Sequence, residues 1–274
     1  MGNGIAQVAA MAGYDVAMHD VQRPVLDRAL ATIRGSLGRL LKAGRIAEDQ
    51  VEAAVARIQP HTDLAGGVKD ADVVIEAVPE IMDVKQKVFV EIDRLCPPRA
   101  ILASNTSGLS ITDIAGATQR PEKVIGMHWF APPVMMRLIE IVRGAGTADE
   151  TVDVIREISR RMGKETVLCN DSPGFITSRA LQALLNECFR IYDEGVASIE
   201  DIDKAIKLGL NHPMGPFELA DYSGVDIPFH ANEGLAAAFG ERFRSPRCLV
   251  DLVASGNLGR KTGRGFYGYQ PKAR

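Results

Sequence analysis

Apolar runs of strand length alternate with helical segments over the first 170 residues, and this alternation limits the possible folds more than any other feature. The apolar runs are rich in Val, Ile and Ala, which is typical of buried strands. We expect strands at residues 14–20, 71–78, 100–104, 123–128, 136–142 and 166–169. We expect helices at residues 4–11, 25–58, 85–95 and 149–162. Alternation of this kind predicts a mostly parallel sheet that is covered by helices.

The pattern changes after the segment Asn170–Gly174. Residues 175–194 have the periodicity of one long helix, and no convincing strand follows up to Leu252. We therefore predict two domains, an α/β domain over residues 1–170 and an all-α domain over residues 171–274.

The first residues resemble the end of a glycine-rich turn that opens a helix. In a Rossmann-type dinucleotide-binding domain, a GxGxxG turn joins the first strand to its helix, and an acidic residue about 20 positions later binds the ribose. Gly2 fits the last part of such a turn, and Asp20 fits the acid at the end of the next strand. We therefore expect that the sequence begins inside the turn and that the first strand is missing from it. The alternative is a flexible terminus and an ordinary loop carboxylate.

Composition and charge exclude several classes of protein. The 274 residues are 46% hydrophobic and 24% charged, as in a soluble globular protein, and the net charge of −3 offers no general basic field for nucleic acid. The four cysteines form no CxxC pair, so neither a disulfide framework nor a zinc site is expected. No run is long enough to span a membrane, and no secretory leader is evident. We predict a cytoplasmic enzyme with no bound metal.

Five motifs, in order along the chain, resemble those of the 3-hydroxyacyl-CoA dehydrogenases. They are residues 103–111 (ASNTSGLSI), 126–133 (GMHWFAPP) with 138–140 (LIE), 171–179 (DSPGFITSR), 212–219 (HPMGPFEL) and 259–267 (GRKTGRGFY). The resemblance covers essentially the whole chain. It implies a Rossmann-type NAD-binding domain followed by a helical domain for substrate binding and dimerisation.

The resemblance also implies a catalytic set. His128 takes the proton of the substrate's 3-hydroxyl group while hydride leaves for the nicotinamide, and Glu140, twelve residues later, orients the imidazole. This suits the chemistry, because an imidazole ordinarily titrates near neutral pH and a carboxylate fixes its tautomer. Ser107 corresponds to the residue that hydrogen-bonds the 3-oxygen, and Ser178 borders the same atom. Without the motifs, a histidine at a strand end is more often structural.

A second implied set surrounds the cofactor. Asn105 lies beside the nicotinamide in this family, and Glu80 and Lys85 approach the ribose and nicotinamide side. Asp20 favours NAD over NADP, because a carboxylate repels a 2′-phosphate. Taken alone, Asn105 could satisfy a turn and Glu80 with Lys85 could form an ordinary solvated surface.

Two positions depart from the family pattern, which has asparagine where this chain has Ala131 and Ser178. A serine is a shorter donor that reaches the same substrate atom only through a water. Altered substrate preference or lower activity is therefore expected.

We predict NAD-dependent, reversible oxidation of an (S)-3-hydroxyacyl-CoA, with a short chain such as 3-hydroxybutyryl-CoA, in fatty-acid or butyrate metabolism. The alternatives are a hydroxyacid dehydrogenase whose substrate lacks CoA and a non-catalytic relic that binds no NAD. A homodimer is expected through the helical domain, with an acyl-CoA as the other partner and neither nucleic acid nor membrane. Leu181, Leu184 and Leu185 could instead form intramolecular core.

Overall fold

The computed structural model describes residues 1–269, which form two compact units. The first unit is Met1–Ser172, and the second begins at Pro173. No helix among the described residues is long and apolar enough to cross a lipid bilayer.

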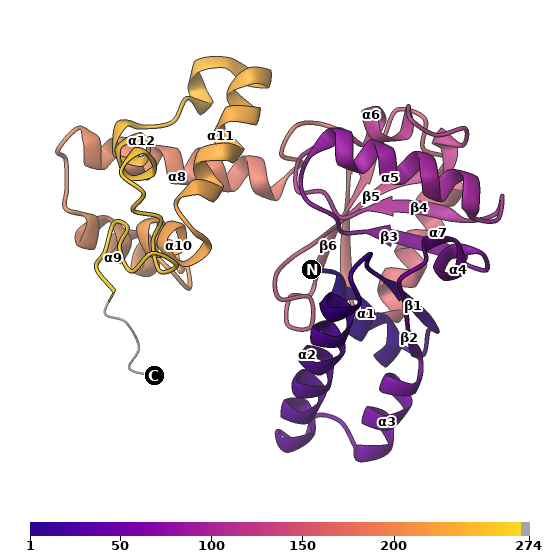
Figure 1. The fold of residues 1–274 in the computed structure, drawn as a ribbon. Helices are drawn as coiled ribbons and strands as arrows, with labels where there is room; N and C mark the ends of the chain where they lie inside the picture. Colours follow the sequence, from indigo (N-terminus) through magenta and orange to yellow (C-terminus); the bar gives the residue numbers. More distant parts are fainter. Residues whose placement is uncertain (270–274) are drawn as a thin grey trace. The chain divides into compact units, whose positions relative to one another are not determined.

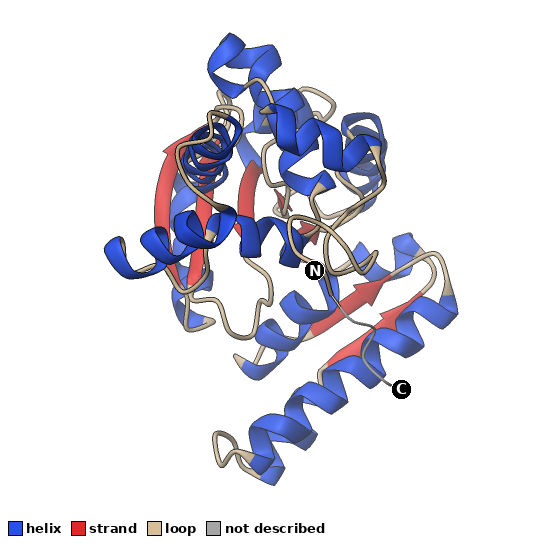
Figure 2. Ribbon diagram, turned by 90° about the vertical axis from the view of Figure 1, so that its left-hand side faces the viewer, coloured by secondary structure: helices blue, strands red, loops and turns tan. Residues whose placement is uncertain are grey.

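The first unit begins with a small α/β layer. Its elements are α1 (Gly2–Met11), β1 (Val16–His19), α2 (Arg23–Lys42), α3 (Glu48–Ala56) and β2 (Ile58–His61). β1 and β2 pair in parallel as a two-stranded sheet, with Val16 opposite Ile58. Figure 2 shows these two strands side by side, and Figure 1 shows α2 and α3 extending together from them. Apolar side chains of α1, α2 and both strands form one core, which includes Leu26 and Leu37.

A five-stranded sheet follows in the order β3-β4-β5-β6-β7. Its elements and their connections are α4 (Leu64–Val68), β3 (Val73–Glu76), α5 (Met82–Leu95), β4 (Ile101–Ser104), α6 (Ile111–Ala115), η1 (Pro121–Lys123), β5 (Val124–Trp129), β6 (Leu138–Arg143), α7 (Asp149–Arg161) and β7 (Glu165–Asn170). All neighbours pair in parallel except β5 and β6, which are antiparallel. The predicted α/β fold with a mostly parallel sheet is confirmed.

Successive side chains of a strand point to opposite faces of the sheet, so β5 contributes to the cores on both sides. Ile125 and Met127 of β5 belong to the core that includes α1 and α7. Gly126 and His128 lie on the other face. A Cβ on Gly126 would lie 2.9 Å from the side chain of Ile111, so the glycine lets α6 approach the strand closely.

One part of the predicted element order was wrong. Residues 25–58 are not one helical region, because α2 ends at Lys42 and a turn with Gly44 at φ +65° separates it from α3. Residues 58–61 form strand β2, which the sequence did not predict. This strand is short and contains Gln59 and Pro60, so it lacks the apolar run by which the other strands were found.

The second unit is helical, as predicted, and residues 173–269 contribute only two isolated β-bridges. Its elements are α8 (Thr177–Asp193), α9 (Ile199–Gly209), α10 (Pro216–Ser223), α11 (Asp226–Phe239), η2 (Gly240–Phe243) and α12 (Arg247–Ala254). Phe189, Phe217 and Leu249 form the centre of its core. On α8, Leu185 is buried in this core, Leu184 packs against it and Leu181 is exposed.

Two buried aspartates hold the last described turn of this unit. Asp221 of α10 accepts hydrogen bonds from the Phe266 and Tyr267 backbone N–H groups, both at 2.9 Å, and from the Tyr269 hydroxyl. Asp203 of α9 accepts hydrogen bonds from the Phe217 backbone N–H at 2.9 Å and the Tyr267 hydroxyl at 2.7 Å. The two carboxylates are 0% and 1% exposed.

Space is also tight around Asp221. A Cβ added at Gly265 would collide with the Asp221 carboxylate, so only glycine fits there. The turn therefore closes directly over a buried charge.

Candidate active site

The carboxyl ends of β3, β4 and β5 lie at one edge of the five-stranded sheet, because these strands are parallel. The start of α1 reaches the same edge. A Cβ on Gly2 would lie 3.9 Å from the Cβ of Ala77, just after β3, and a Cβ on Gly4 would lie 2.8 Å from the ring of Pro133. Ligands of open α/β sheets bind at this edge, so it is the place to look for a site.

His128 and Glu140 form a buried pair on β5 and β6. They stand directly opposite each other in the antiparallel register, and His128 Nδ1 lies 2.7 Å from Glu140 Oε2. His128 is 5% exposed and Glu140 is 0% exposed. The ring of Phe130 lies 4.5 Å from the imidazole, centroid to centroid, and is tilted against it by 42°. The carboxylate therefore fixes the orientation of the ring within an apolar setting.

The turn after β4 carries Asn105 and Ser107. The Asn105 side-chain oxygen accepts the backbone N–H of Trp129 at 2.9 Å, which ties this turn to the end of β5 and to the strand of His128. Ser107 is exposed, and its backbone N–H donates to Glu80 Oε1 at 2.8 Å. The structure thus brings Asn105, Ser107 and His128 to the same edge.

Glu80 and Lys85 are also at this edge, but in unequal settings. The Lys85 side chain is 1% exposed and lies 2.8 Å from Glu76 and 3.3 Å from Glu80. The Glu80 side chain is 44% exposed. The interpretation of both as ordinary solvated surface is wrong for Lys85, which is among the most completely buried side chains of the chain's described part.

Asp20 follows β1 and is partly exposed. Its Oδ1 accepts the backbone N–H of Gln22 at 2.9 Å, and its own N–H donates to the carbonyl of His61. These contacts hold the acid at the end of the strand.

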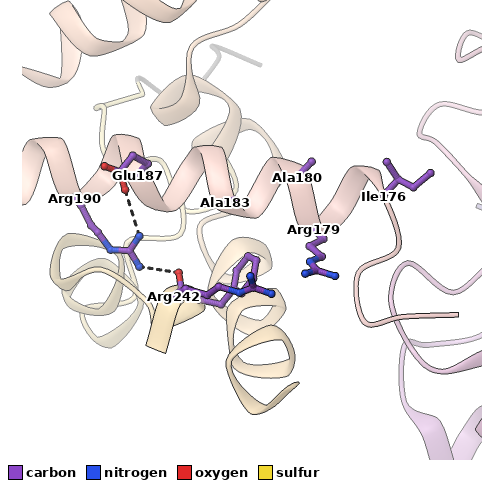
Figure 3. A pocket seen from close by; sticks show the side chains of 8 residues that line it. Ile176, Arg179, Ala180, Ala183, Glu187, Arg190 and Arg242 are labelled. Carbon is purple, nitrogen blue, oxygen red and sulfur yellow. Dashed lines mark hydrogen bonds and ion pairs between the residues drawn. The ribbon is translucent and has the colours of Figure 1, made fainter. Parts of the chain in front are cut away.

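Ser178 lies in the first turn of α8, in the second unit. The next residue, Arg179, lines a cavity of about 440 Å³ together with Ala183, Arg190 and Phe243. Figure 3 shows this cavity along one side of α8, where Arg190 binds Glu187 and the carbonyl of Arg242. The place of Ser178 in the site stays a prediction.

Comparison with known proteins decides the family. Residues 1–172 match the 3-hydroxyacyl-CoA dehydrogenase NAD-binding domain, and residues 174–269 match the C-terminal domain of the same family. The chain belongs to the 3-hydroxyacyl-CoA dehydrogenase family.

Individual members of the family are similar over nearly the full length. A probable 3-hydroxybutyryl-CoA dehydrogenase of Bacillus subtilis is 43% identical, with 99% of this chain and 95% of the relative covered. The 3-hydroxybutyryl-CoA dehydrogenase of Bradyrhizobium diazoefficiens is also 43% identical, with 98% and 92% covered. The crystal structure of the (S)-3-hydroxybutyryl-CoA dehydrogenase of Ralstonia eutropha superposes with a TM-score of 0.96 at 41% identity, covering 99% and 96% of the two chains.

Sequence reasoning did not identify every polar residue at this edge of the dehydrogenase fold. Glu76 and Thr106 contact the predicted cofactor residues, and Lys164 donates to the carbonyls of Pro133 and Met136, at 2.6 and 2.8 Å, in the loop between β5 and β6. Glu76 had a detectable signal, since it is the one charged residue in an otherwise apolar strand. A buried charge of that kind requires a partner.

Proposed function

We propose that this member of the family oxidises a short-chain (S)-3-hydroxyacyl-CoA to the 3-oxoacyl-CoA, reversibly and with NAD. The observation that carries the proposal is the buried pair of His128 and Glu140 at the carboxyl edge of the sheet, 2.7 Å apart. A base that is oriented by a carboxylate, and that lies beside a cofactor edge, suits removal of a hydroxyl proton.

The residues present fit the cofactor. The start of α1 carries small residues, including Gly2, and a helix start favours the pyrophosphate. Asp20, at the end of β1, would accept a hydrogen bond from the adenosine ribose, and its charge would disfavour a 2′-phosphate. Bound NAD would supply the hydride acceptor. Lys85, Glu80 and Asn105 would hold its nicotinamide half.

His128 would act as the base. Its Nδ1 faces Glu140, so the Nδ1–H donates to the carboxylate and the proton acceptor of the neutral ring is Nε2. When the 3-hydroxyl proton moves to Nε2, the ring becomes an imidazolium. The adjacent negative charge of Glu140 stabilises that cation, and the pair returns the proton in the reverse direction.

Substrate contacts would come from Ser107 and Ser178, and Ala131 is the second position where this chain lacks the family's asparagine. Ser107 is on a turn that is tied at two points, through Asn105 and through Glu80, so its hydroxyl would be held for the 3-oxygen. Ser178 replaces a longer side chain, and a bridging water would complete its contact. We expect weaker transition-state binding than in members with asparagine at these positions.

The assembly and the cellular setting belong to the same proposal. A homodimer formed by the second unit is supported by large apolar residues that are exposed there, including Val196, Leu208 and Tyr222. A cytoplasmic location and a place in fatty-acid or butyrate metabolism complete the proposal. Size-exclusion chromatography with light scattering would test the dimer.

The deciding experiment measures NADH formation from (S)-3-hydroxybutyryl-CoA and NAD by the protein expressed from its natural gene. The expected result is turnover that His128→Gln reduces by about 10²-fold or more, with folding and NAD binding unchanged. Full turnover in the variant would exclude His128 as the base.

A matched substrate distinguishes this activity from that of a hydroxyacid dehydrogenase whose substrate lacks CoA. Free (S)-3-hydroxybutyrate has the same reacting carbon but no CoA. We expect kcat/KM for the free acid to be far below that for the thioester. Equal values would identify an enzyme for substrates without CoA, and no turnover of either one, despite NAD binding, would contradict the proposed activity.

A further inference from the structure

Glu76, the last residue of β3, is a buried carboxylate for which the proposed reaction has no use. The residue is 5% exposed, and both oxygens are engaged. Oε1 accepts hydrogen bonds from Lys85 Nζ at 2.8 Å and from the Val78 backbone N–H at 2.6 Å. Oε2 accepts one from the Ser104 hydroxyl at 2.7 Å. The side chain therefore links three neighbouring segments, β3, α5 and β4.

Lys85 is shared between two carboxylates. Its ammonium lies 2.8 Å from Glu76 Oε1 and 3.3 Å from Glu80 Oε2. The Glu76 and Lys85 side chains are each 1% exposed, whereas that of Glu80 is 44% exposed. With all three groups ionised, the buried pair is neutral and the remaining negative charge lies on the exposed Glu80.

Glu80 in turn holds the turn that carries Ser107. Its Oε1 accepts hydrogen bonds from the Thr106 hydroxyl at 2.5 Å and from the Ser107 backbone N–H at 2.8 Å. A second path reaches the same turn, because the Ser104 hydroxyl that donates to Glu76 also accepts the Thr106 backbone N–H at 3.3 Å. Glu76 is thus connected to one turn by two independent routes.

We propose that Glu76 is a positioning residue for the dehydrogenase reaction, which fixes the Ser107 turn through Lys85 and Glu80 and through Ser104. Because Glu76 compensates the positive charge of Lys85, the Glu80 carboxylate remains available to the two donors of that turn. This inference rests on the proposed function, in which Ser107 contacts the substrate. The competing account is an ordinary buried ion pair that contributes to stability alone.

A double-mutant cycle separates the two accounts. Glu76→Gln keeps the size of the side chain but removes its charge, so Lys85 turns to Glu80 and competes with Thr106 and Ser107. Because the amide oxygen in Glu76→Gln can still accept the Ser104 hydroxyl, this variant tests the route through Lys85 and Glu80. We expect kcat/KM to fall about tenfold in Glu76→Gln, and Glu76→Gln combined with Glu80→Gln to be no worse than Glu80→Gln alone. Additive losses would overturn the route through Glu80.

A control pair exists on the same helix. Asp93 of α5 is also a buried carboxylate with a cationic partner, Arg120 at 2.5 Å, and it is far along the helix from Lys85. Asp93→Asn should lower stability and leave kcat/KM unchanged per folded molecule. If Asp93→Asn lowered kcat/KM as much as Glu76→Gln, general destabilisation would explain both results.

Hydrogen exchange provides a readout that requires no turnover. The backbone amides of Thr106 and Ser107 should exchange at least tenfold faster in Glu76→Gln, while the amides of β5 keep their protection. Unchanged exchange in the turn would refute the positioning role. If the wild-type protein turned over no 3-hydroxyacyl-CoA, the proposed function would fail, and the exchange rates would still decide the role of Glu76.

Discussion

Both units bury carboxylates, but these carboxylates have different kinds of partner. At the carboxyl edge of the first unit, Glu140 faces the imidazole of His128 and Glu76 faces the ammonium of Lys85. In the second unit, Asp203 and Asp221 accept hydrogen bonds from backbone N–H groups and tyrosine hydroxyls.

This difference separates a reactive site from a structural one. Burial raises the pKa of Asp203, and its hydrogen bonds with Tyr267, Phe217 and Glu218 partly oppose that rise. Burial and the hydrogen bond to Asp221 raise the pKa of Tyr269 to about 12. Such partners hold their protons throughout the physiological range, so the carboxylate acts as a fixed anchor. In the first unit, by contrast, the partner of Glu140 is the imidazole that would accept the substrate's proton.

The largest effect is expected when the reactive pair is broken. Glu140→Gln removes the charge that stabilises the imidazolium, so kcat should fall by about 10²-fold or more, while the free energy of unfolding changes little. Steady-state kinetics and urea unfolding of the same preparation measure the two quantities. A large loss of stability with unchanged kcat would assign Glu140 to the structural class.

The opposite result is expected in the second unit. Asp221→Asn leaves at least one donor of the Phe266–Tyr269 turn unsatisfied, which should lower the free energy of unfolding by about 1–3 kcal/mol. kcat and KM of the folded fraction should not change. The exposed Asp251→Asn is the matched control and should alter neither. A changed KM in Asp221→Asn would break the distinction between the two regions.

Lys164 tests the distinction within the first unit, because it is a buried charge whose partners are backbone carbonyls. Burial lowers its pKa below the ordinary 10.5. Just below pH 10.5 the unfolded chain therefore binds more protons than the folded one, and the stability of the wild type should rise with pH relative to Lys164→Met. Urea unfolding over this pH range measures the difference. A relative stability that falls with pH would contradict the assignment.

The smallest effect on activity is expected for one cysteine in each unit. Burial, with the charges of Glu140 and Asp171, raises the pKa of Cys169 to about 11, and burial, with the charge of Asp203, raises that of Cys188 to about 11. At pH 8 both should react with iodoacetamide about 100-fold more slowly than an unperturbed thiol, without loss of activity. Mass spectrometry of timed samples gives the rates. Rapid labelling of either cysteine would show that its surroundings are more open than the structure indicates.

Strands that contain a run of three apolar residues could be predicted, as in β3 (VVI) and β4 (ILA). β2 could not, because its identity depends on pairing with β1 and not on its own residues. The antiparallel direction of β6 was equally hidden, since a buried strand has the same composition in either direction.

The functional residues also fall into those that the sequence identifies and those that only the structure shows. His128 and Glu140 were found because motifs identify them, and the structure adds their distance, burial and register. The anchors Asp203 and Asp221 were not found, since on an amphipathic helix an aspartate is usually assigned to the solvent. Their partners Tyr267 and Phe266 lie 64 and 45 residues away, a separation that no local pattern bridges.

The antiparallel register of β5 and β6 has a consequence for how this catalytic pair can evolve. His128 meets Glu140 because they are opposite partners on adjacent strands, and a slip of one residue would turn one of them to the other face. The spacing of twelve residues has no chemical meaning of its own, because the strand register, and not the length of the loop at 130–137, places the two side chains opposite each other. Insertions or deletions in that loop that preserve the register would therefore leave the catalytic pair intact.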